Sequence, residues 1–134
     1  MTTAVIPDKF QPRLADEKVI WLTTVGQDGS PQPNPVWFLW EGETVLTFSR
    51  PDAKRLAHIK RNPRVSLHLN CTRTGGDVTV LTGRAEVLED DPTAYPDYVV
   101  KYRTDIEGIS GTVEAFAKEY SVPTRVVVDR ARGF

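Results

Sequence analysis

The chemistry suggested by this sequence begins at a cluster of cations around a short turn. Ser49 and Arg50 precede a Pro-Asp pair, and Lys54 and Arg55 open the helix expected after it. The first backbone N–H groups of a helix lack partners within the helix, and together with side-chain cations they bind phosphate. A lysine in the first turn opposes the helix dipole, and a bound anion would offset that cost. The cluster therefore predicts a phosphate site.

An apolar strand just before this cluster could hold a flat ring. In it Val36, Phe38 and Trp40 alternate with Trp37 and Leu39, so both faces of the strand are apolar. A strand with this pattern is covered on both sides. One cover is the core, and the other is a cofactor ring, a helix or a partner subunit. A ring platform beside a phosphate site indicates a nucleotide-like redox cofactor.

The distribution of charge also favours an anionic ligand in this region. The net charge of the 134 residues is only −1, which argues against a general nucleic-acid or membrane binder. Residues 53–76 contain six basic and no acidic residues, whereas residues 86–119 contain nine acidic and three basic ones. No aromatic residue lies between Arg50 and Asp77 for bases to stack on, so single-stranded nucleic acid is a poor alternative ligand.

Several classes of protein are not supported. The single cysteine excludes an intramolecular disulfide, no Cys/His cluster has metal-ligand spacing, and no Gly-x-Ser-x-Gly motif indicates hydrolysis. No apolar run reaches the about 20 residues of a membrane span, and residues 1–10 lack the features of a signal peptide. We therefore expect a cytoplasmic protein without a metal site, built as a single domain over residues 1–134.

Local patterns predict a mainly β protein with a few helices (α+β). Strands are predicted at residues 18–25, 33–40, 44–49, 64–71, 77–88 and 123–129, and helices from 51 or 52 to 61, at 92–103 and at 112–120. Asp28-Gly29 marks a hairpin turn, Pro33 and Pro35 place their strand at an edge, and Gly83 marks a bend or bulge. Six strands of this kind suit a small closed or split barrel.

Three further side chains, two histidines and the cysteine, are of types that can do chemistry. His58 is expected on a solvated face of its helix. His68 lies on the polar face of its strand, where it either contacts a ligand or is simply exposed. Cys71 falls on the apolar face of the same strand, so we expect a core position and not a nucleophile.

A series of short segments carries a further signal through order and spacing. They are Leu22-Thr23-Thr24-Val25-Gly26, Asp28-Gly29-Ser30-Pro31-Gln32-Pro33, Pro35-Val36-Trp37-Phe38, Thr47-Phe48-Ser49, Lys54 with Ile59, Arg61-Asn62-Pro63-Arg64-Val65-Ser66-Leu67 and Gly83-Arg84-Ala85-Glu86-Val87. Together they resemble the flavin and deazaflavin oxidoreductases of the pyridoxamine 5′-phosphate oxidase-like split-barrel superfamily. The resemblance is greatest to the branch that uses coenzyme F420, a deazaflavin, and is firmest over residues 19–89.

The resemblance implies a six-stranded antiparallel split β-barrel of the FMN-binding type. It also implies a homodimer with a cofactor groove at each subunit interface, and we expect that interface to include residues 33–40. The cofactor carries the hydride chemistry and the protein supplies position and charge, so no catalytic side chain is expected. Val36 and Trp37 would line the ring. The phosphate would be held by Ser49, Arg50, Lys54 and Arg55.

The implied function is an F420-dependent oxidoreductase that transfers a hydride between the cofactor and an unsaturated small molecule. An FMN-binding oxidoreductase of the same fold and a non-catalytic flavin or deazaflavin binder are the alternatives. F420 has an additional anionic tail, for which Lys60, Arg61 and Arg64 are available. Asp52 stands where many relatives have a neutral or basic residue, and it could cap the helix. Residues 90–120 are least like the relatives, so the substrate stays open.

Overall fold

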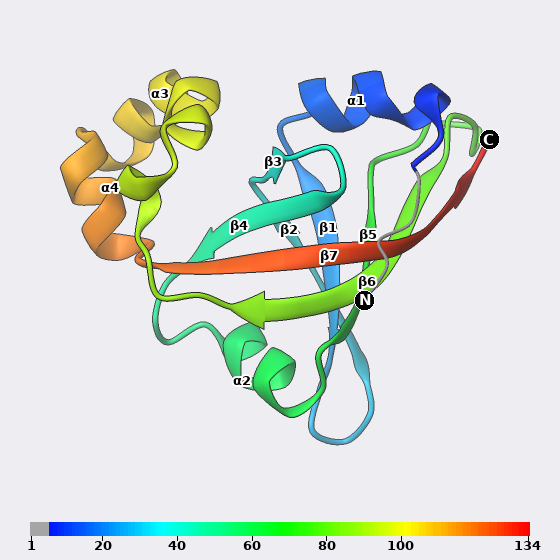
Figure 1. Cartoon of the computed structure of the whole chain (residues 1–134), viewed down its shortest axis with the longest axis horizontal. Helices are drawn as coiled ribbons and strands as arrows, with labels where there is room; N and C mark the ends of the chain where they lie inside the picture. Colours follow the sequence, from blue (N-terminus) through cyan, green and yellow to red (C-terminus); the bar gives the residue numbers. More distant parts are fainter. Residues whose placement is uncertain (1–5) are drawn as a thin grey trace.

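A computed structural model describes residues 6–134 and shows a curled antiparallel sheet surrounded by helices (Figure 1). Seven strands follow the order β2-β1-β5-β6-β7-β4-β3. They are β1 (Ile20–Val25), β2 (Pro31–Val36), β3 (Leu39–Trp40), β4 (Thr44–Ser49), β5 (Arg64–His68), β6 (Thr79–Val87) and β7 (Val122–Gly133). The helices are η1 (Asp8–Phe10), α1 (Gln11–Asp16), α2 (Lys54–Arg61), η2 (Pro92–Ala94), α3 (Pro96–Ser110) and α4 (Val113–Glu119).

The sheet curls because its two edge strands are consecutive in the chain. β2 pairs with β1, and β3 pairs with β4, so the two lie at opposite ends of the strand order. Only Trp37 and Phe38 separate them along the chain. The three Cα–Cα steps between the strands span at most about 11 Å. The two edges are therefore drawn together into a half-barrel that is split between β2 and β3.

The prediction of six strands is wrong, because the strand expected at residues 33–40 is two strands. At the break, the N–H of Phe38 donates to the Tyr102 hydroxyl (2.9 Å), and its carbonyl oxygen accepts from Lys101 Nζ (2.8 Å). The Tyr102 hydroxyl in turn donates to the backbone oxygen of Lys18, just before β1 (2.6 Å). Side chains of α3 thus take the place of ladder hydrogen bonds, which no local pattern in residues 33–40 could indicate.

The two apolar faces of this segment belong to two different cores. Val36 and Phe38 lie in the interior of the half-barrel, and Trp40 packs against the same cluster. Trp37 and Leu39 pack against a second cluster, formed by β4 with α3 and α4. Figure 1 shows these two helices together at one end of the sheet. The predicted alternation is confirmed, and within the chain the second cover is a pair of helices.

Predictions from turn residues are largely confirmed. The β1–β2 turn is closed by a hydrogen bond from Gly26 N–H to Ser30 O (2.8 Å), and Gly29 has φ +87°. β2, with its prolines, is an exposed edge strand. The strand register shifts between Thr82 and Gly83, which is the predicted bulge. A side chain at Gly83 would collide with the backbone oxygen of Val127, so this close approach requires glycine.

Two predictions near chain turns are wrong. β5 ends at His68, and the chain then turns, so Cys71 is exposed and not in the core. Asp52 does not cap α2, because the helix begins at Lys54 and its N-cap residue Ala53 makes no side-chain capping bond. In both cases the chain leaves the regular element earlier or enters it later than the residue pattern suggests.

Removing the Tyr102 hydroxyl should destabilise the fold. We expect Tyr102→Phe to lower the free energy of unfolding by about 1–3 kcal/mol, because the buried N–H of Phe38 loses its acceptor. Urea denaturation measures the change. Tyr98→Phe is the matched control, since the Tyr98 hydroxyl has no hydrogen-bond partner among residues 6–134. Equal losses in both variants would contradict the importance of the Phe38 contact.

Stability should also depend on the charge of Lys101. Burial, and secondarily the charge of Lys18, lowers the pKa of Lys101 from 10.5 to about 8. Between these two values the unfolded chain keeps a proton that the folded chain has lost, so stability rises with pH. We expect wild type to gain stability relative to Lys101→Met as the pH rises from about 8 towards 10. Urea denaturation across this range checks it, and a constant difference would contradict it.

Candidate functional site

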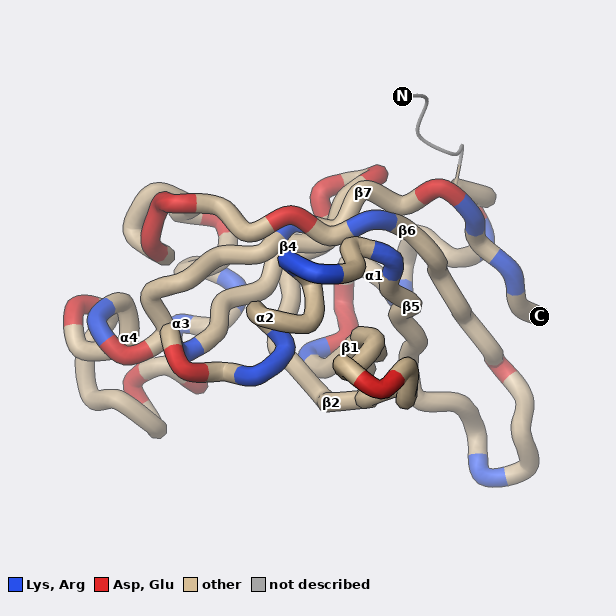
Figure 2. The backbone as a smooth tube through the Cα atoms, turned by 90° about the horizontal axis from the view of Figure 1, so that it is seen from below, with Lys and Arg blue, Asp and Glu red and all other residues tan. Residues whose placement is uncertain are grey.

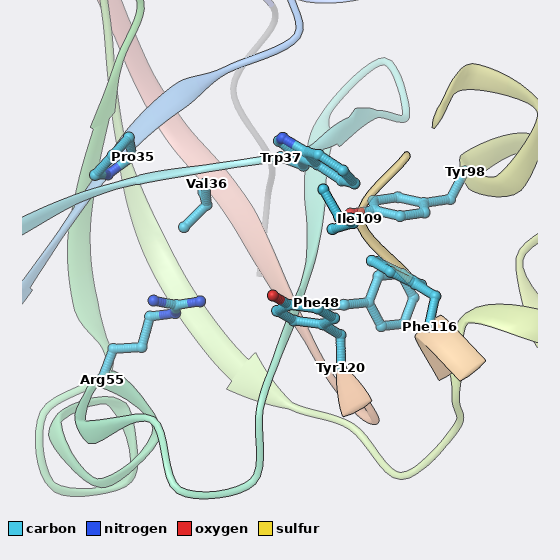
Figure 3. A pocket seen from close by; sticks show the side chains of 9 residues that line it. All are labelled: Pro35, Val36, Trp37, Phe48, Arg55, Tyr98, Ile109, Phe116 and Tyr120. Atoms are coloured by element: carbon cyan, nitrogen blue, oxygen red, sulfur yellow. The ribbon is translucent and has the colours of Figure 1, made fainter. Parts of the chain in front are cut away.

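A cavity of about 260 Å³ lies where the split in the barrel meets α2, α3 and α4. We call it the aromatic cavity. Figure 3 shows the side chains that line it, which come from the end of β2, from β4 and from the three helices. They are Pro35, Val36, Trp37, Phe48, Arg55, Tyr98, Ile109, Phe116 and Tyr120. Its volume is below the about 300–1,000 Å³ of most ligand pockets, so it suits one small ring system.

Trp37 is held in the wall of this cavity by stacking. Its ring is nearly parallel to that of Tyr102 (centroids 4.9 Å apart, planes at 5°) and to that of Phe116 (6.0 Å, 15°). The same break that separates β2 from β3 therefore turns Trp37 towards the helices while Val36 stays on the barrel side. A flat apolar wall results.

Arg55 brings a positive charge into the aromatic cavity. Its Nε donates to the hydroxyl of Ser49 (2.9 Å), which is buried beneath it. Burial lowers the pKa of the Arg55 guanidinium. Figure 3 shows the guanidinium directed into the cavity, opposite the hydroxyl of Tyr120. No carboxylate of residues 6–134 forms an ion pair with it. A half-buried cation without a counter-ion is costly, and an anionic or oxygen-rich ligand would offset the cost.

Lys54 lies in a second and more open hollow of about 410 Å³, between α2 and the β1–β2 turn. We call it the hairpin groove. It is lined by Gly26, Gln27, Asp28, Gln32, Lys54 and His58. The prediction that His58 is merely solvated is wrong: its Nδ1 is 2.9 Å from the hydroxyl of the buried Thr24, so the ring is packed against β1. Figure 2 shows α2 flanked by Lys and Arg, whereas Asp and Glu are concentrated around α3 and α4.

The remaining predicted cations lie outside both hollows. Arg50 forms an ion pair with Glu119 and lies over the ring of Tyr120 (5.3 Å). Lys60 is exposed, and Arg61 donates to the backbone oxygen of Val25 (3.3 Å). The residues predicted to hold the cofactor are therefore divided. Val36, Trp37 and Arg55 meet in the aromatic cavity with Ser49 beneath them, Lys54 lies in the hairpin groove, and Arg50, Lys60 and Arg61 lie at the margins.

His68 and residues 90–120 differ in whether they line these hollows. His68 lies beside Trp21 with the rings stacked (6.1 Å, 3°) and lines neither of these hollows. Residues 90–120, by contrast, supply four of the cavity's side chains, which are Tyr98, Ile109, Phe116 and Tyr120.

The aromatic residues of this region were missed from the sequence. Tyr95, Tyr98 and Tyr102 are spaced by three and four residues, as are Phe116 and Tyr120 by four, which places each set on one side of a helix. This spacing is visible in the sequence, but the helices and the acidic charge predicted for the segment do not by themselves indicate a ring-binding wall. Phe48 was also missed, although it stands beside the predicted site residue Ser49.

Two absences hold for residues 6–134. No group of three His, Cys, Asp or Glu side chains in that range could hold a metal ion. No helix in it has the length and apolar character needed to cross a membrane.

Comparison with known proteins establishes the family. The Pyridoxamine 5′-phosphate oxidase family matches residues 6–132, and the chain belongs to it. The chain is similar to a solved F420 reductase (23% identity, TM-score 0.76, 95% of this chain and 98% of that one covered). It is also similar to a FAD-binding protein from Mesorhizobium loti (20%, 0.70, 98% and 96%) and to General Stress Protein 26 from Bacillus anthracis str. Sterne (18%, 0.73, 92% and 89%). No curated protein sequence matches.

The resemblance seen in the sequence is thereby confirmed at the level of the family. The matched structures are all below 25% identical, so they show a shared fold. The identity of the cofactor and the activity depend on the site itself.

If Arg55 is kept for a ligand and not for folding, its removal should cost the fold little. We expect Arg55→Met to change the free energy of unfolding by less than about 1 kcal/mol, because removal of the half-buried unpaired charge offsets the loss of the hydrogen bond to Ser49. Arg13→Met is the matched control, since Arg13 donates to the backbone oxygens of Asp77 and Asn70 (both 2.6 Å). Thermal denaturation should show the larger loss for Arg13→Met, and the opposite order would give Arg55 a structural role.

Proposed function

We propose that this protein is an F420-dependent oxidoreductase that transfers a hydride between the deazaflavin and an unsaturated small molecule. The observation that carries the proposal is the half-buried guanidinium of Arg55, which has no carboxylate partner among residues 6–134 and faces an aromatic cavity beside Val36 and Trp37. A ring with polar oxygens would use the apolar wall and the cation together. The family membership and the similarity to an F420 reductase support the same proposal.

The cofactor would lie across the start of α2. In this arrangement the ring system lies against Val36 and Trp37, and the phosphate lies towards Lys54 in the hairpin groove. Lys54 and Arg55 are adjacent in sequence, but a helix turns by about 100° per residue, so they serve different hollows. The residues present therefore fit a ligand with a ring at one end and an anion at the other. When bound, the deazaflavin would supply the hydride chemistry.

For the anionic tail of F420, the structure offers fewer cations than the sequence suggested. Arg64 is engaged in an ion pair with Asp129 (2.6 Å), so the proposed site for an anionic tail does not include it. Lys60 and Arg61 are exposed and stay in that proposed role.

An FMN-binding oxidoreductase is the second candidate, and a non-catalytic binder of either cofactor is the third. The similarity to a FAD-binding protein favours a flavin as much as the F420 reductase favours a deazaflavin. We also propose a cytoplasmic homodimer. α3 and α4 cover the second face of residues 37–39, so the surface proposed for the interface is the exposed edge strand β2.

Titration with the two cofactors tests the proposed function. We expect F420 to bind more tightly than FMN, and Lys54→Ala to weaken both about 10- to 100-fold, because a charge-assisted contact to phosphate is worth about 1.5–3 kcal/mol. Fluorescence titration gives the dissociation constants. The double variant Lys60→Ala/Arg61→Ala should weaken only F420, by up to about 1 kcal/mol per contact and less at high salt.

The controls separate the candidates. Tighter binding of FMN, with the double variant equal to wild type for both cofactors, would replace the deazaflavin by the flavin. Binding of F420 without turnover of any unsaturated acceptor would favour the non-catalytic binder. Failure of both cofactors to bind would remove the proposal altogether.

A further inference from the structure

Two threonine hydroxyls are buried inside the half-barrel without a partner. Thr47 of β4 and Thr124 of β7 are each only 1% exposed. Neither hydroxyl makes a hydrogen bond with any of residues 6–134. A buried hydroxyl left unpaired costs free energy, and native proteins pair such groups with protein atoms or with ordered water. The two hydroxyls therefore point to a partner from outside the chain.

The two threonines are direct neighbours across the sheet. β4 and β7 are antiparallel, and Thr47 lies opposite Thr124 in their register. Side chains in such a pair have Cβ atoms about 4.5–5.5 Å apart. Val45 and Val126, two residues away on the respective strands, belong to the core inside the half-barrel. Because side chains alternate along a strand, Thr47 and Thr124 face the same interior.

A third buried hydroxyl lies on the same face of β4. Ser49 follows Thr47 by two residues, and its oxygen accepts the hydrogen bond from Arg55 Nε (2.9 Å). A hydroxyl that accepts a hydrogen bond still has its own proton to donate. On the other side of Thr124, its β6 neighbour is the apolar Val87. The polar groups are therefore confined to the end of the barrel interior that lies next to α2.

A single water molecule matches this set of groups. Buried waters have two to four polar partners and make about three hydrogen bonds. Two hydroxyl oxygens up to about 5.6 Å apart can share one water, since each O–H···O bond spans about 2.8 Å. A metal ion is unsuited, because the three hydroxyls carry no formal charge to offset its loss of hydration.

We propose that an ordered water molecule binds inside the half-barrel between Thr47 and Thr124. It donates to both threonine oxygens and accepts the proton of the Ser49 hydroxyl. Since Ser49 in turn accepts from Arg55, the water is the last link of a chain that fixes the direction of the guanidinium in the aromatic cavity. Thr47 and Thr124 are thus positioning residues for Arg55, and the site does not depend on the proposed function.

A double-mutant cycle tests the shared water. Valine has the shape of threonine without the hydroxyl, so Thr47→Val and Thr124→Val each remove one partner of the water. We expect each single variant to lower the midpoint of thermal unfolding by about 2–6 °C. The double variant should lose no more than the less stable single variant, because all three lack the same bridge. In a dry core each valine would raise the midpoint and the two increases would add, which would overturn the proposal.

The matched control is Thr23→Val. Thr23 is a strand threonine on the outer side of β1, between the core residues Leu22 and Thr24, and it is not fully buried. This variant should keep the wild-type midpoint. An equal loss in Thr23→Val would trace the effect to valine in a strand and overturn the proposal.

A high-resolution crystal structure identifies the bridging group. We expect a water within hydrogen-bond distance of both threonine hydroxyls in wild type and none at this place in the double variant. A direct hydrogen bond between Thr47 and Thr124 without a water would overturn the proposal.

The link to Arg55 has its own measurement. In NMR, the Arg55 Nε–H should exchange with solvent about two- to tenfold faster in the double variant than in wild type, because its acceptor Ser49 is less firmly held. Thr23→Val should keep the wild-type rate. Equal rates in wild type and the double variant would overturn the positioning role. None of these measurements uses a cofactor, so failure of F420 and FMN to bind would remove only the proposed function.

Discussion

The split in this barrel depends on how the backbone of Phe38 is satisfied. A buried peptide group must find hydrogen-bond partners, and here its N–H and carbonyl oxygen contact Tyr102 and Lys101 of α3 instead of a neighbouring strand. This frees the chain to leave one edge of the sheet at Val36 and join the opposite edge at Leu39. The helix that follows β6 in the sequence thus holds together the segment that closes the sheet, and barrel and helices are expected to unfold as one unit.

The same contact creates the candidate site. Just before Phe38, Val36 remains inside the barrel while Trp37 faces the helices, so one cavity is lined by a residue of each core. That cavity also receives the Arg55 guanidinium, whose charge has no carboxylate partner among residues 6–134. A half-buried charge of this kind is unfavourable for stability alone, which is the usual sign that a surface is kept for a ligand.

A turn, an edge strand and a bulge could be predicted because each depends on the backbone preference of one or two residues. The Asp28-Gly29 turn needs a positive φ, the prolines of β2 exclude a central strand, and Gly83 allows a close approach to β7. The strand at residues 44–49 was predicted with the observed bounds, since its apolar run is closed by turns. His58 and Cys71 were misplaced for a related reason. Their burial depends on Thr24 of β1 and on where β5 stops, and neither is encoded beside them.

The sequence by itself determined the family, the strand-rich architecture and the presence of cations at the start of α2, because these follow from residue order and periodicity. Only the tertiary structure decided that Lys54 and Arg55 serve different hollows and that Arg50 is paired with Glu119. It alone brought Tyr98 and Phe116 to Trp37, from which they are separated by about half of the chain. The physical reason is that a ligand site is made by contacts between distant elements, and the free energy that orients each side chain there comes from neighbours that local sequence does not reveal.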